Sequence, residues 1–158
     1  MNGKIHIEPG TMIIEVNDAG ETISLPLGDQ AFTGGLVELM QTFSQKADEL
    51  SSAAGKIDTS TNTAEKVNEL SAVASLNLRI CTEMKEKTDA LFADEVCRKV
   101  FGDIVPSLSA FSDFFDQLSP FVAKYRDDMI AACKKSVEKY TKKYHRDSDE
   151  RGSEYGRS

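Results

Sequence analysis

The feature that most constrains the fold of this chain is a long apolar stripe near its C-terminus. From Leu108 to Tyr144, apolar residues recur every three or four positions, which is the spacing of one face of an amphipathic helix. The pattern lasts about five heptads, as in a coiled-coil seam, and an unbroken helix would measure about 55 Å. A compact domain does not need such a helix, so part of it should project or meet a partner. The stripe consists of Leu108, Phe111, Phe115, Leu118, Val122, Tyr125, Met129, Cys133, Val137, Tyr140 and Tyr144.

Two residues set the expected limits of this helix. Ser107 follows Pro106 and can cap its first turn. Pro120 lies inside the stripe and removes one backbone hydrogen bond, so we expect a kink or a split near Leu118 and Ser119.

The N-terminal region has a different pattern and predicts a β-hairpin. The segments 12–16 and 21–25 are β-branched or alternate in polarity, and the turn-forming residues 17–20 separate them. Ile5 and Ile7 alternate with polar residues and leave open whether a third strand precedes the hairpin. Because a lone two-stranded hairpin is marginal in water, this one should pack on the helices or pair with another chain.

A first helix is expected to follow the hairpin. Asp29 is a plausible N-cap, and Gly55 is a good stop. Gly34 and Gly35 weaken the first turn, so they form a flexible start and the regular helix begins after them. The apolar stripe of this helix consists of Leu36, Leu39, Phe43, Ala47, Leu50 and Ala54.

A second helix should begin at about Thr63, after a polar linker. Residues 94–101 then form a short third helix that Gly102 closes, or the second helix bends near Ala93. The apolar stripe of the second helix consists of Val67, Leu70, Ala74, Cys81, Met84, Thr88 and Leu91.

These elements predict a mainly α fold, a small antiparallel helical bundle with an N-terminal β-hairpin and a long C-terminal helix. The length of 158 residues and the 40% hydrophobic content suit one domain with a core. We assign that domain to residues 1–146, with the hairpin region in 1–28 and the helices in 29–146. Residues 147–158 have almost no apolar side chains and predict a disordered polar tail.

Composition narrows the classes of function. A formal charge of −7 argues against a nucleic-acid binder. No apolar run approaches the roughly 18 residues of a membrane span, and the N-terminus lacks the apolar region of a secretory signal. The three cysteines are odd in number and widely spaced, as in a reducing compartment. We therefore expect a cytoplasmic protein that binds neither nucleic acid nor membrane.

Catalytic and metal-binding patterns are missing from the sequence. His6 and His145, one near each end, are the two histidines, and neither a Cys-x-x-Cys pair nor a His-Glu-x-x-His motif occurs. Cys81, Cys97 and Cys133 lie on or beside apolar stripes, so we interpret them as core residues. We expect no catalytic residue, no cofactor and no metal.

A phenylalanine cluster lies where the long helix begins. Half of the eight phenylalanines fall within residues 111–121. They form either a wide buried face or a hydrophobic contact site for another protein. The candidate contact residues are Phe111, Phe114, Phe115, Leu118, Phe121, Tyr125 and Tyr140.

A basic run over residues 134–146 carries six basic and one acidic side chain. It can complement the helix dipole near a C-terminus. It can also bind an acidic partner or the acidic body of a second copy. Nucleic acid is the least favoured of the three interpretations, because the chain as a whole is acidic.

The order of these pieces resembles the small α-helical tail assembly chaperones of tailed bacteriophages and prophages. The resemblance rests on the order of four pieces, the last of which runs into a lysine-rich end. They are the hairpin Ile13–Leu25, a helix with Leu36, Leu39 and Phe43, the segment Cys81–Gly102 and the aromatic helix start Leu108–Leu118. It implies a bacterial host and a protein that binds the tape-measure protein, tail-tube subunits or both. Self-association is another use of the seam. The alternatives are a structural coiled-coil component of a phage tail or neck, and a small helical adaptor protein.

Overall fold

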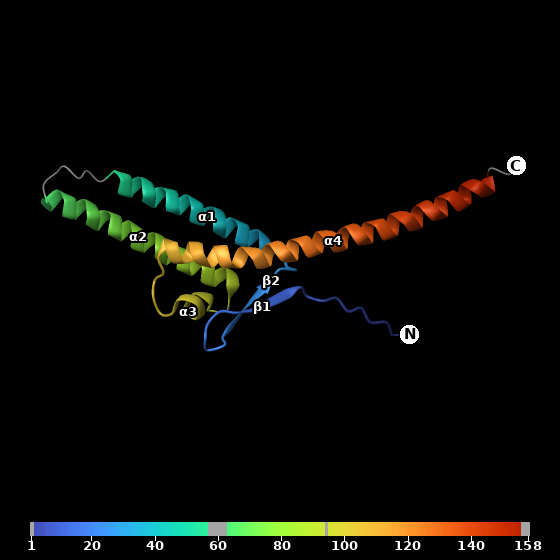
Figure 1. Cartoon of the computed structure of the whole chain (residues 1–158), viewed down its shortest axis with the longest axis horizontal. Helices are drawn as coiled ribbons and strands as arrows, with labels where there is room; N and C mark the ends of the chain where they lie inside the picture. The colour runs from blue at the N-terminus through green and yellow to red at the C-terminus, as the bar shows by residue number, and fades with distance from the viewer. Residues whose placement is uncertain (1, 57–62, 94, 156–158) are drawn as a thin grey trace. The chain divides into compact units, whose positions relative to one another are not determined.

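A computed structural model of the chain describes residues 2–56, 63–93 and 95–155, and the backbone alone for Thr63 and residues 144–155. The fold is mainly helical with one antiparallel hairpin, as the sequence predicts (Figure 1). The chain forms two compact units, residues 1–116 and 117–158. The elements are β1 (Thr11–Glu15), β2 (Thr22–Pro26), α1 (Gln30–Gly55), α2 (Thr63–Phe92), α3 (Val96–Phe101) and α4 (Leu108–Tyr155).

The hairpin forms with the expected turn. Strands β1 and β2 pair antiparallel, with Ile13 opposite Ser24. The Gly20 N–H donates to the Asn17 carbonyl at 3.1 Å, and Gly20 takes a positive φ of 80° that favours glycine. Among the described residues 2–10 no third strand forms, and Ile5 is largely exposed.

Only one strand of the hairpin faces the core. In β2 and just after it, Ile23, Leu25 and Leu27 are buried, because successive side chains of a strand alternate between its two faces. In β1 the pattern is weaker, and Ile13 is exposed. The hairpin therefore gains its stability by packing β2 on the helices, as its small size requires.

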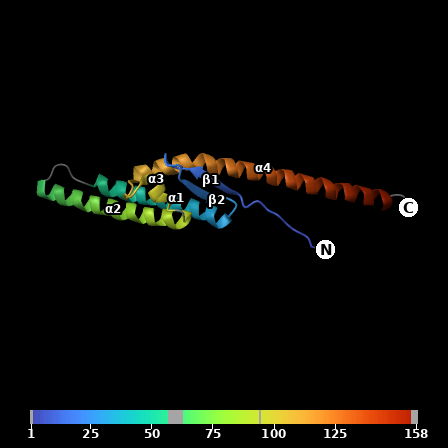
Figure 2. The same cartoon turned by 90° about the horizontal axis from the view of Figure 1, so that it is seen from below.

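Helices α1 and α2 lie side by side and antiparallel (Figures 1 and 2). Asp29 caps α1 by accepting the Ala31 N–H at 3.0 Å, and the helix ends at Gly55 as expected. The expected flexible start is not seen, since α1 begins at Gln30 and includes both glycines. A methyl group at Gly35 would lie 2.7 Å from Leu91 Cδ1, so this glycine permits a close approach of α2.

Helix α2 ends at Phe92 and α3 is a separate short helix, so the prediction of a short third helix holds and that of one bent helix does not. Ala93 and Glu95 both have a positive φ, 59° and 51°, a conformation that costs energy for residues with a side chain. An Asp89 carboxylate oxygen accepts the Cys97 N–H at 3.0 Å and ties the two helices together. Gly102 closes α3 with a φ of 83°.

Helix α4 is continuous through Pro120, so the expected split does not occur. Ser107 caps its start by accepting the Ala110 N–H at 3.1 Å. Proline removes the hydrogen bond to the carbonyl four residues earlier, which belongs to Asp116. Asp116 is exposed, so water can replace that bond and the helix continues.

The domain limits deduced from the sequence differ from the two compact units. The compact units divide after Asp116, inside α4, and the single domain 1–146 stays a prediction. The helix also continues to Tyr155, within the segment 147–158 that was expected to be disordered. A polar composition prevents burial in a core, but extending an existing helix needs no core because each added residue gains one backbone bond. Residues 156–158 of that segment lie outside the described residues.

We predict that the two neighbouring glycines of α1 respond differently to alanine. Gly34→Ala should raise the free energy of unfolding by about 0.5–1 kcal/mol, because alanine is the better helix former and its methyl group meets open space. Gly35→Ala should gain clearly less, because the methyl group must displace Leu91. Denaturant unfolding of the two variants measures both values, and equal gains would contradict the close approach at Gly35.

Candidate protein-contact surfaces

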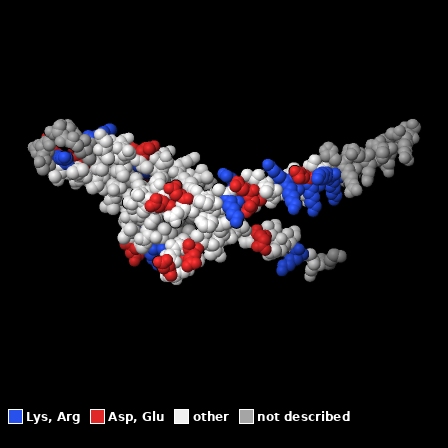
Figure 3. All heavy atoms as spheres, viewed as in Figure 1, with Lys and Arg blue, Asp and Glu red and all other residues white. Residues whose placement is uncertain are grey.

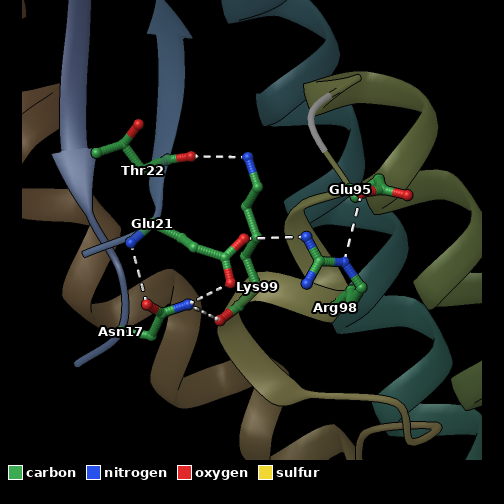
Figure 4. Close-up of polar contacts among 6 residues, drawn as sticks. All are labelled: Asn17, Glu21, Thr22, Glu95, Arg98 and Lys99. Atoms are coloured by element: carbon green, nitrogen blue, oxygen red, sulfur yellow. Dashed lines mark hydrogen bonds and ion pairs between the residues drawn. The ribbon is translucent and has the colours of Figure 1, made fainter. Parts of the chain in front are cut away.

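A cluster of polar side chains joins the hairpin to α3 (Figure 4). The Asn17 amide donates to the Lys99 carbonyl at 3.0 Å, and the Lys99 ammonium donates to the Thr22 carbonyl at 3.0 Å. Arg98 pairs with Glu21 at 3.0 Å. The hydrogen bond from Arg98 is the main cause that lowers the pKa of Glu21, and desolvation opposes it. Each of these contacts joins the hairpin to α3, so the cluster fixes the position of the hairpin on that helix.

Four of the seven candidate contact residues lie in the core, and contact of these residues with a partner stays a prediction. All four, Phe111, Phe114, Phe115 and Leu118, are at most 8% exposed, so a partner cannot reach them without opening the fold. Their burial matches the alternative of a wide buried face. Edge-to-face contacts join the rings at centroid distances of 5.2 Å (Phe101–Phe111), 5.4 Å (Phe43–Phe115), 5.8 Å (Phe101–Phe114) and 5.9 Å (Phe92–Phe114).

The other three candidate contact residues lie in the unit 117–158. Phe121 and Tyr140 are exposed, at 41% and 62%, and Tyr125 is half-buried. Their role as contact residues stays a prediction, and their side chains are accessible to a partner.

The accessible apolar face of α4 is wider than its aromatic residues. We call Val122, Tyr125, Met129, Cys133, Val137 and Tyr140 the α4 stripe. Its members from Met129 onward are exposed. Ile130, at the edge of the stripe, borders a shallow depression of about 310 Å³ together with Cys133 and Val137. Met129, Ile130 and Val137 are not among the candidate contact residues predicted from the sequence, although the spacing of three and four residues already places Met129 and Val137 on the stripe.

Lys and Arg side chains gather along the part of α4 that carries the exposed half of the stripe (Figure 3). Residues 134–143 carry five lysines and one glutamate, a net charge of +4, whereas residues 1–116 carry 9 basic and 19 acidic side chains, a net charge of −10. Charge is therefore divided between the two units.

A second apolar surface lies on the α1–α2 pair. Val67, Leu70 and Leu78 of α2 are exposed, and a groove of about 580 Å³ runs between the two helices. Within the described residues, Glu69 Oε2 is buried without a hydrogen-bond partner. The groove is lined by Glu49, Ser52, Ala53, Lys56, Glu69, Ala72, Val73 and Leu76.

The cysteines divide into two buried residues and one exposed residue. Burial raises the pKa of the Cys81 thiol. Burial, reinforced by the negative charge of Asp89, raises the pKa of Cys97 to about 12. These two thiols stay protonated near neutral pH and behave as small apolar groups. Cys133 is exposed, which corrects its interpretation as a core residue, because no element of the described structure covers that part of the stripe.

We predict that Phe111→Ala and Phe121→Ala differ sharply in stability. Phe111 is fully buried, and truncating such a residue costs about 3–5 kcal/mol because it leaves a cavity. Phe121 is 41% exposed and should cost less than half as much. Denaturant midpoints measure both losses, and a larger loss for Phe121→Ala would contradict the placement of the core.

We also predict that a thiol reagent at neutral pH modifies one cysteine of the folded chain. Cys133 should react faster than the other two thiols, because it alone of the three is exposed on the single chain, and Cys133→Ser should remove the fast reaction. Denaturant should release the other two thiols. Fast modification of Cys97 in the native protein would show that α3 opens readily.

The described residues offer no arrangement for metal chemistry. None of their histidine, cysteine, aspartate and glutamate side chains form a group of three that could hold a metal ion. In the same part of the chain, no helix combines the length and apolarity of a membrane span.

Comparison with protein-family models, curated proteins and solved structures finds no match.

Proposed function

We propose that this chain is a non-enzymatic protein-binding protein that assists bacteriophage tail assembly in the bacterial cytoplasm. Its clients would be the tape-measure protein, tail-tube subunits or both. The observation that carries the proposal is the exposed half of the α4 stripe, where Met129, Val137 and Tyr140 are each about half exposed or more. Exposed apolar faces on helices mark protein contacts, and the resemblance of the layout supplies the class of client.

The α4 stripe suits a helical client. An amphipathic helix binds by placing its apolar face against another apolar surface, and the tape-measure protein of such a tail is expected to be long and helical. The lysines at 134–143 would contact acidic groups at the edge of the client. The acidic unit 1–116, with a net charge of −10, would keep a complex with an aggregation-prone client in solution.

Co-expression with the products of the neighbouring genes tests the proposal. We expect the tagged chain to capture a very long helical protein or a tail-tube subunit. Val137→Glu should weaken capture about tenfold, because burying a valine side chain is worth about 1.5 kcal/mol. Ala131→Glu is the matched control, because Ala131 is exposed on the opposite side of the helix and should leave capture unchanged.

Two outcomes would contradict the proposal. Equal capture by both variants would show that the client binds elsewhere, and the α1–α2 groove would be the next surface to test. Recovery of the chain alone, as a defined oligomer that also copurifies with finished virions, would favour a structural coiled-coil component of the tail.

A further inference from the structure

The apolar residues of the α4 stripe are spaced symmetrically about Ala131. Starting from Val122, the steps to Tyr125, Met129, Cys133, Val137 and Tyr140 are three, four, four, four and three residues. The same series is obtained when the helix is read in the opposite direction. A helix with this symmetry can pair with an identical antiparallel helix so that every member of the stripe faces another member.

The exposed part of the α4 stripe is an apolar surface that a partner can bury. Met129 and Val137 are exposed, and helices of this kind owe most of their stability to burial of the apolar face. The stripe spans about 120° of the helix surface at roughly 100° per residue, which is wide enough for a packed interface.

We propose that, without a client, α4 pairs antiparallel with the same stretch of a second copy. The two-fold axis crosses the stripe at the level of Ala131, whose own side chain lies on the opposite side of the helix. Val122 then faces the partner's Tyr140, Tyr125 faces the partner's Val137, and Met129 faces the partner's Cys133. The two-fold symmetry repeats each of these contacts. A two-fold interface uses one patch twice, and the stripe supplies a self-complementary patch.

Charge favours the antiparallel over the parallel arrangement. In the antiparallel pair, residues 134–143, with a net charge of +4, lie opposite residues 119–128, which carry two basic and two acidic side chains. Asp127 and Asp128 then lie level with the partner's Lys135 and the partner's Lys134 along the helix axis, on the outer sides of the pair. In a parallel pair the two +4 segments lie side by side at the usual helix spacing of about 8–10 Å, which is close to the Debye length of physiological salt, so a partly screened repulsion remains.

The spacing also suits two nearly straight helices. Val122 and Cys133 are eleven residues apart, as are Met129 and Tyr140. An eleven-residue repeat corresponds to about 3.67 residues per turn, close to the 3.6 of an undistorted helix. The stripe therefore stays on one side of α4 across the whole paired stretch without strong supercoiling.

This inference rests on the proposed use of α4 as a protein-contact surface, and it makes the client and the second copy competitors for that surface. A client would bind by separating the pair. The free protein would keep its apolar stripe covered until then.

Cysteine cross-linking of the purified full-length chain, without any client, tests the pairing and its direction. In Met129→Cys, the new thiol faces the partner's Cys133, so mild oxidation should give a covalent dimer on a non-reducing gel. Adding Cys133→Ser should abolish that dimer. Wild-type chains should not cross-link, because the two Cys133 positions are offset by about 6 Å along the axis, which places their Cα atoms beyond the roughly 7 Å limit of a disulfide. Cys81 and Cys97 are buried and do not interfere.

Light scattering supplies an independent measurement. The wild type should be a dimer, Val137→Lys should be a monomer, and the matched control Ala131→Lys should stay a dimer because it changes the opposite side of α4. Both positions are exposed, so neither variant should unfold the chain.

Three results would overturn the inference. Cross-linking of wild type through Cys133, or of Met129→Cys with Cys133→Ser, would show a parallel pair. A wild type that stays monomeric at high concentration would show that α4 does not pair with itself. Val137→Lys that stays a dimer would place the dimer interface elsewhere. If client capture persists in any of these cases, the self-pairing fails while the proposed function stands.

Discussion

The packing of aromatic rings at the start of α4 is the interaction on which the unit 1–116 depends. Phe101 of α3 contacts both Phe111 and Phe114 of α4, and Phe114 also contacts Phe92 at the end of α2. Phe92 in turn meets Phe32 of α1. One network of edge-to-face contacts therefore joins all four helices. Because α3 has six residues and cannot be stable alone, this network and the polar ties to the hairpin hold it in place.

Helix α4 meets two different environments along one apolar stripe. Phe111 and Leu118 are buried, whereas Met129 and Tyr140 are exposed, although the spacing of three and four residues is the same throughout. The first part builds a core, and the second part presents the same kind of surface to solvent. The apolar face of an amphipathic helix is normally buried against another element. The exposed part of α4 lacks such a neighbour within the described residues, and we therefore propose that it contacts another protein.

The proposed client and the proposed second copy use this surface in the same physical way. Both would bury the α4 stripe, and both would place acidic groups near the lysines of 134–143. Self-pairing would then set a threshold for client binding, because the free energy of separating two copies must be recovered from contacts with the client. Such a threshold would favour long apolar clients over short or polar ones.

Local interactions of this protein are determined by its sequence alone. Asp29 and Ser107 cap helices, and Asn17 and Gly20 form the hairpin turn, because each of these hydrogen bonds joins residues at most three positions apart. Only the tertiary structure decided that Phe114 is buried while Cys133 is exposed. Both residues belong to apolar segments of one helix, and their burial depends on which other elements cover them. The same reason explains Gly35, whose role follows from contact with Leu91, a residue far away along the chain.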